Sequence, residues 1–172
     1  MRRFKPAIGS AVFFVVAPGT FAVLLPWLIT GWRLDTPLPG WIAARVIGVL
    51  LILVGAIPLV HAFVQFARAG GTPAPVAPTR HLVVSGFNRY LRNPMYAGIT
   101  VALLGQALLF GQLGLVLYAA AFWAVTAAFV HWYEEPTLRR QFGAEYEAYR
   151  RQVPAWWPRR TPVVLPGWTD PR

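Results

Sequence analysis

Residues 80–98 read RHLVVSGFNRYLRNPMYAG, and this stretch decides the fold. Its last arginine, Arg92, lies directly before residues 93–133, a run of 41 residues without a formally charged side chain. Glu134 and Glu135 follow that run at once. A helix rises about 1.5 Å per residue and the hydrocarbon core of a bilayer is about 30 Å thick, so the run is too long for one crossing. It therefore predicts two antiparallel membrane helices.

The turn of this hairpin is predicted at residues 111–114, which read GQLG. We expect one helix over residues 94–110 and the next over residues 114–133. Both outer ends then lie on the same side of the membrane, where Arg92 can meet Glu134 and Glu135. Two glycines in the first of these helices, Gly98 and Gly105, are seven residues apart on one face and predict close helix contact.

Composition supports a membrane protein. The chain is 56% hydrophobic and 13% charged, whereas soluble domains carry about 25% charged residues. The net charge of +10 would also suit a nucleic-acid-binding protein, but the arginines flank apolar segments, as the positive-inside rule describes. We therefore expect the lipid bilayer and no nucleic acid as partner. Cysteine is absent and the three histidines are scattered, so we expect no metal site.

The remaining sequence predicts three more helices and a C-terminal tail. Residues 7–30 and 41–66 are apolar and predict two further transmembrane helices. From residue 136 a helix lying at the membrane surface is expected, with an apolar stripe of Leu138, Phe142, Tyr146, Tyr149 and Val153. Residues 154–172 predict an extended interfacial tail.

The predicted fold is an all-α integral membrane protein with four transmembrane helices and a C-terminal amphipathic interfacial helix. It divides into two N-terminal transmembrane helices (1–69), a core of loop, helical hairpin and amphipathic helix (70–160), and a tail (161–172). The basic segments all fall on one side of this arrangement, which places both termini in the cytoplasm. The loop over residues 68–92 is either a linker or a segment with a role at a site, as a membrane-surface lid or a cradle for a cofactor.

Single residues at the helix ends have local explanations. Asn93 is a good N-cap and Pro94 is favoured at the first helical position. The combination predicts more, because Arg92, Asn93 and Tyr96 lie at one helix end while two carboxylates lie at the neighbouring end. Such a cluster suits a zwitterion with a cationic centre, since carboxylates can hold an amine and an arginine can hold a carboxylate. No serine–histidine pair or phosphate-binding glycine loop accompanies it.

The order of these motifs resembles a known family. The elements are residues 80–98, Glu134–Glu135, a segment with the pattern Phe142-Gly-x-Glu-Tyr-x-x-Tyr149, and Val153-Pro154. Together they resemble the C-terminal core of the isoprenylcysteine carboxyl methyltransferase and phospholipid methyltransferase superfamily. The resemblance covers about residues 70–160.

This resemblance implies an integral membrane enzyme that uses S-adenosylmethionine without a Rossmann domain. It implies catalytic roles for Arg92, Asn93 and Glu135. The implied cofactor-binding residues are Arg80, His81, Leu82, Val83, Asn93, Pro94, Met95, Tyr96 and Glu134. Asn93 stands where the isoprenylcysteine enzymes have a histidine, and Val130 lies near the position of one of their arginines, so recognition of a prenylcysteine carboxylate need not carry over.

We therefore expect an S-adenosylmethionine-dependent methyltransferase that acts on a lipophilic or small carboxylate, amine or thiol. It would work by positioning the acceptor at the cytosolic face of the bacterial inner membrane. Two alternatives stay open: an NADPH-dependent membrane reductase with a related sterol-reductase-like core, and a non-enzymatic lipid-binding membrane protein.

Overall fold

The computed structural model describes residues 16–68, 82 and 84–163. Within these ranges every regular element is a helix. The elements, in order, are η1 (Thr20–Leu24), α2 (Leu25–Thr30), α3 (Ile42–Arg68), η2 (Gly86–Arg89), α4 (Pro94–Phe110), α5 (Leu113–Phe129), η3 (Val130–Glu134), α6 (Glu135–Phe142) and α7 (Ala144–Gln152).

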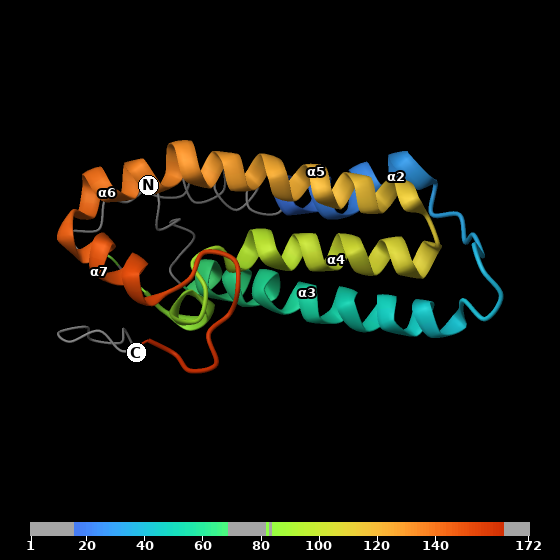
Figure 1. Ribbon diagram of the computed structural model, residues 1–172, viewed down its shortest axis with the longest axis horizontal. Helices are drawn as coiled ribbons and strands as arrows, with labels where there is room; N and C mark the ends of the chain where they lie inside the picture. The colour runs from blue at the N-terminus through green and yellow to red at the C-terminus, as the bar shows by residue number, and fades with distance from the viewer. Residues whose placement is uncertain (1–15, 69–81, 83, 164–172) are drawn as a thin grey trace, which may run out of the picture.

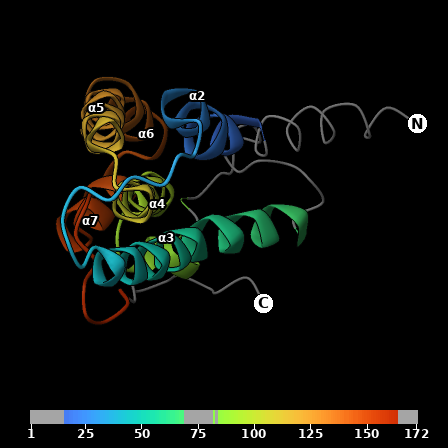
Figure 2. The same ribbon diagram turned by 90° about the vertical axis from the view of Figure 1, so that its right-hand side faces the viewer.

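Three long helices define the body of the molecule. α3, α4 and α5 run along its long axis, with α6 and α7 at one end and the connection between α2 and α3 at the other (Figure 1). Viewed along that axis, α4 lies between α5 and α3, and α2 lies beside α5 (Figure 2). The end that carries α6 and α7 is called the cap below.

Two helices are long and apolar enough to cross a membrane, Ile42–Val64 and Leu113–Phe142. Val16–Thr30 and Pro94–Phe110 are apolar but shorter. The prediction of four spans is therefore not confirmed, although the helix predicted over residues 94–110 has both bounds correct. This helix ends at Gly111, whose φ of +69° is a left-handed conformation that favours glycine. Of the first predicted helix, residues 7–15 lie outside the described residues.

The close helix contact predicted from Gly98 and Gly105 is confirmed, and its partner is α3. A Cβ atom added to Gly98 would lie 2.6 Å from the carbonyl oxygen of Gly55, and one added to Gly105 would lie 2.6 Å from that of Gly48. Real Cβ atoms essentially never approach so closely. The α3 and α4 backbones therefore touch directly, and four glycines make this possible.

The helix that contains η1 is tied to α4 and α5 by polar side chains. Gln106 donates a hydrogen bond from Nε2 to the Ala22 carbonyl oxygen at 2.8 Å, and the Tyr118 hydroxyl donates to the Phe21 carbonyl at 2.9 Å. A π-helical turn leaves carbonyls poorly paired within its own helix, so side chains from neighbours can complete them. These bonds attach the first described helix to the body.

The break predicted after residue 133 is wrong. The chain continues as a helix from α5 through η3 into α6. Pro136 lacks a backbone donor and crowds the preceding turn, but η3 widens that turn, and the Glu135 N–H donates to the Val130 carbonyl five residues back. A π turn thus lets the helix pass the proline, and it places Glu134 and Glu135 inside a continuous helix.

The single amphipathic helix predicted from residue 136 is also wrong, because it is two helices. Gly143, with φ of +50°, separates α6 from α7. The predicted apolar stripe still comes together, but it packs in a protein core with the cap residues Leu82, Val84 and Val163. The stripe therefore packs against residues of the loop before α4.

Candidate functional site

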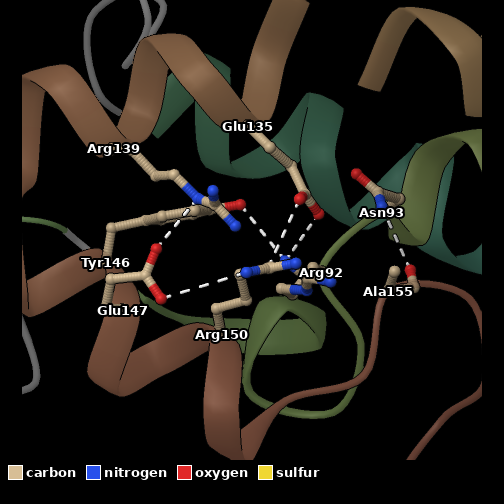
Figure 3. A network of polar contacts seen from close by, with 8 residues as sticks. All are labelled: Arg92, Asn93, Glu135, Arg139, Tyr146, Glu147, Arg150 and Ala155. Atoms are coloured by element: carbon tan, nitrogen blue, oxygen red, sulfur yellow. Dashed lines mark hydrogen bonds and ion pairs between the residues drawn. The ribbon is translucent and has the colours of Figure 1, made fainter. Parts of the chain in front are cut away.

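An ion pair between Arg92 and Glu135 lies at the centre of the cap. Arg92 comes two residues before α4, and Glu135 is the first residue of α6. Nη1 of Arg92 lies 2.7 Å from Oε1 of Glu135, and the two side chains are only 12% and 11% exposed (Figure 3). The ends of the two hairpin helices therefore meet, as the sequence predicted.

Two residues of α7 complete this network. Nε of Arg150 lies 3.4 Å from the second oxygen of Glu135, and Arg92 donates a hydrogen bond to the Tyr146 hydroxyl at 3.2 Å (Figure 3). Burial raises the pKa of Tyr146, so its hydroxyl is neutral at physiological pH. The sequence placed Tyr146 in the predicted apolar stripe, and no motif indicated Arg150 as a site residue. Only the fold at Gly143 turns both toward Glu135.

Arg92 and Asn93 are held by the segment that follows α7. The Arg92 N–H donates to the Pro154 carbonyl at 2.9 Å, and the Asn93 N–H donates to the Ala155 carbonyl at 3.3 Å. Nδ2 of Asn93 donates to the same Ala155 oxygen at 3.1 Å. Asn93 occupies the N-cap position of α4, but its side chain makes no capping bond. The predicted N-cap position of Asn93 is therefore confirmed, but its carboxamide is engaged with Ala155 and does not bond to the first turn of α4.

A small cavity of about 30 Å³ lies against this network. Its lining is mixed, with ionisable groups at one side and apolar or phenolic groups around them: Arg92, Asn93, Val130, Glu134, Glu135, Leu138, Tyr146 and Tyr149. The site residues Arg92, Asn93, Glu134 and Glu135, predicted from both helix ends, all line it.

Glu134 has an unusual environment within the cavity. Its Oε2 atom is buried and has no hydrogen-bond partner among the described residues. Tyr96, from the first turn of α4, interacts with the same carboxylate. A buried polar oxygen without a partner is energetically costly, so this position calls for a donor or a cation beyond the described residues.

The other predicted site residues have varied positions. Pro94 and Met95 form the first turn of α4, and in the described part of the chain neither is among the cavity-lining residues. Leu82 packs in the cap core, and its N–H donates to Oε2 of Glu145 at 3.0 Å. Arg80, His81 and Val83 lie outside the described residues.

A family model described as phospholipid methyltransferase matches residues 43–145 of this chain, which is more than half of its length. The chain belongs to the phospholipid methyltransferase family. This family is part of the membrane methyltransferase superfamily that also holds the isoprenylcysteine carboxyl methyltransferases. No curated protein and no solved structure matches the chain.

Membership of the phospholipid methyltransferase family indicates a membrane methyltransferase. The matched region includes α4, α5 and α6, and with them Arg92, Asn93, Glu134 and Glu135. Tyr146 and Arg150 lie just beyond it. The two candidate spans agree with membrane association.

Phospholipid methyltransferases generally use S-adenosylmethionine. The polar residues of the cavity fit the charged end of that molecule. Oε2 of Glu134, which has no partner among the described residues, could accept from an ammonium group or lie near a sulfonium. Asn93 adds a carboxamide that hydrogen bonds but does not titrate. The cavity volume is far below the several hundred cubic ångströms that a bound small molecule of this size requires, so binding would require the cap to open.

Proposed function

We propose that this phospholipid methyltransferase family member transfers the methyl group of S-adenosylmethionine to a lipophilic carboxylate, amine or thiol at the cytosolic membrane face. The proposal depends most on one observation, the buried Oε2 of Glu134, which has no hydrogen-bond partner in the described part of the chain and lies beside the Arg92–Glu135 ion pair. A cationic ligand would remove the cost of that unpaired oxygen. The Arg92–Glu135 pair would keep the wall of the site in one geometry.

The proposed mechanism is transfer by positioning. When bound, S-adenosylmethionine supplies a methyl group already joined to a good leaving group, so the chain need not provide a nucleophile. Glu134 would hold the positive charge, and Glu135 would orient Arg92 through their 2.7 Å contact. Asn93 would place a hydrogen bond beside the acceptor. Alignment at a near-attack distance of roughly 3–3.5 Å and exclusion of water would then supply most of the rate gain.

The acceptor in this proposal comes from the bilayer. Outside the cap, the outward surfaces of α3 and α5 are apolar and exposed, including Leu53, Ile57, Leu117 and Val125. Large exposed apolar surfaces of this kind suit contact with lipid. We extend the proposal to four membrane-spanning helices, with Val16–Thr30 and Pro94–Phe110 completing the bundle and both termini in the cytoplasm of a bacterial cell.

Calorimetric titration of S-adenosylmethionine into the purified full chain in detergent tests the proposal. Wild-type protein should bind, and Glu134→Gln should weaken binding by about 30-fold or more, since it removes one partner of a buried charge pair. Glu147→Gln is a matched control, because Glu147 is a 41% exposed carboxylate of the same cap. It should leave the affinity unchanged.

Two further results distinguish the alternatives. Binding of reduced nicotinamide dinucleotide in place of S-adenosylmethionine would indicate a membrane reductase, an activity that the family model does not favour. Binding of S-adenosylmethionine without transfer of radiolabelled methyl into a lipid extract would indicate a non-enzymatic protein. Transfer into the extract would show the acceptor class. Failure of the wild-type chain to bind S-adenosylmethionine would refute the proposal.

A further inference from the structure

The segment after α7, residues 153–163, runs back across the residues that precede α4 and is called the strap here. Beyond the bonds from Arg92 and Asn93, the Val163 N–H donates to the Arg89 carbonyl at 3.0 Å and Arg89 Nε donates to the Val163 carbonyl at 3.1 Å. The strap is therefore tied at both ends, and in its middle the Arg159 N–H donates to the Tyr90 carbonyl at 3.0 Å. None of its residues lies in a helix. Such a segment can move with less disruption than a helix.

Trp156 extends from the strap onto α5. Its ring meets Trp123 edge to face, with centroids 5.9 Å apart and an interplanar angle of 64°. Trp156 follows Ala155, the residue whose carbonyl accepts both bonds from Asn93. The Asn93 side chain therefore fixes where the Trp156 ring lies.

Trp123 connects this contact to the cavity. It lies seven residues before Val130 and eleven before Glu134, so all three share one face of the continuous Leu113–Phe142 helix. Val130 and Glu134 line the cavity. Along the helix, the tryptophan pair lies roughly 10 Å from Val130 in the direction of the apolar body. The pair therefore lies on α5 between the cavity and the apolar end of the helix that is remote from the cap.

The surface beside the pair is suited to an apolar chain. Trp123 is 45% exposed, and Val116, seven residues earlier on the same face of α5, is 38% exposed. The cavity itself, at about 30 Å³, has no room for an acceptor that arrives along this surface. Access from the bilayer thus requires part of the cavity lining to move. The non-helical lining residues, Arg92 and Asn93, are hydrogen-bonded to the strap.

We propose that Trp156 is a specificity-determining residue for the methyl acceptor. With Trp123 it closes the path along α5 from the bilayer to the cavity, and the apolar chain of the acceptor reaches the cavity by displacing the Trp156 ring. Asn93 is a positioning residue in this scheme, because it acts on Trp156 through Ala155. The inference rests on the proposed function for the identity of the occupant, a lipophilic acceptor, while the contact between Trp156 and Trp123 is a feature of the fold.

The absence of cysteine from the chain permits a direct test. Val130→Cys places one thiol in the cavity of the full chain reconstituted in phosphatidylcholine nanodiscs. The rate of its alkylation is measured with N-dodecylmaleimide, which dissolves in the bilayer, and with a charged, water-soluble maleimide. Adding Trp156→Ala should raise the rate with the bilayer reagent roughly two- to tenfold, the range expected for loss of one aromatic pair. The rate with the water-soluble reagent should not change.

Trp157→Ala is the matched control, because Trp157 is adjacent in the strap and 81% exposed. It should not alter either rate. Equal alkylation in the Trp156→Ala and control backgrounds would overturn the inference. An equal rise with both reagents would overturn it too, since it would mean that Trp156 only holds the cap together.

Two other variants keep the test decisive if Trp156→Ala misfolds. Trp123→Ala removes the other ring of the pair and should raise the alkylation rate with the bilayer reagent by a similar factor. Trp156→Phe keeps an aromatic contact, so its alkylation rate should stay near that of the Trp157→Ala control. The proposed function is checked separately by binding of S-adenosylmethionine to wild-type protein. If wild-type protein does not bind S-adenosylmethionine but Trp156→Ala still raises only the rate with the bilayer reagent, the proposed function is refuted and the role of Trp156 is not. If binding and methyl transfer occur but the two reagents show no such difference, only the role of Trp156 is refuted.

Discussion

The two carboxylates that bridge arginines in the cap provide a test of how burial changes the value of an ion pair. Glu135 contacts Arg92 and Arg150 at 2.7 and 3.4 Å and is 11% exposed. Glu147 contacts Arg139 and Arg150 at 2.8 and 3.9 Å and is 41% exposed. Glu135→Gln and Glu147→Gln therefore remove the same charge from two similar arrangements that differ mainly in burial.

Removing one partner of a buried ion pair costs about 3–5 kcal/mol, because the remaining charge is left without compensation. The substitution Glu135→Gln keeps an amide oxygen that can still accept from Arg92, so we expect the low end of that range, about 3 kcal/mol. An exposed pair contributes about 0–1 kcal/mol. Glu147→Gln should thus lower the free energy of unfolding by less than about 1 kcal/mol.

Unfolding in detergent by increasing denaturant, followed by tryptophan fluorescence, measures both changes. The double variant Arg92→Met with Glu135→Met is a further control. Replacing a buried pair by apolar residues of similar volume is often neutral or stabilising, so it should restore stability relative to Glu135→Gln while still abolishing methyl transfer. Equal destabilisation by Glu135→Gln and Glu147→Gln would refute the reasoning from burial.

Two further predictions concern helix contact and pH. Gly105→Ala should destabilise the fold by about 1–3 kcal/mol, since the new methyl group would meet the Gly48 backbone. Gly114→Ala is the control and should be tolerated, because its methyl group would meet only a side-chain atom at 3.5 Å. Thermal unfolding of the two variants measures the difference. Burial raises the pKa of Tyr149, whose hydroxyl donates to the Asn88 carbonyl at 2.8 Å. Because the neutral hydroxyl is favoured in the folded state, Tyr149 contributes stability that is fully present below the ordinary tyrosine pKa of about 10 and is lost as pH rises toward the folded-state value. Tyr149→Phe should therefore reduce the fall in melting temperature at alkaline pH. An unchanged dependence of melting temperature on pH would contradict this prediction.

Much of the helical framework is readable from local sequence. The bounds of α4 follow from Pro94 at one end and Gly111 at the other, because each residue type has a backbone conformation suited to that position. The meeting of Arg92 with Glu135 follows from the hairpin, since two antiparallel helices of similar length must bring their outer ends together. The family resemblance also rests on local motifs, and the match over residues 43–145 confirms it.

Tertiary structure decided what the site contains. Sequence periodicity could not show that η3 carries the helix past Pro136, because a proline in isolation predicts a break and only the widened turn removes the clash. Likewise, Tyr146 and Arg150 reach Glu135 because Gly143 turns α7 back over the cap. The sequence by itself determined which helices form and which charges stand at their ends, since these depend on neighbouring residues. The partners of those charges, and the place of Trp156 against Trp123, depend on contacts between distant segments that only the folded chain brings together.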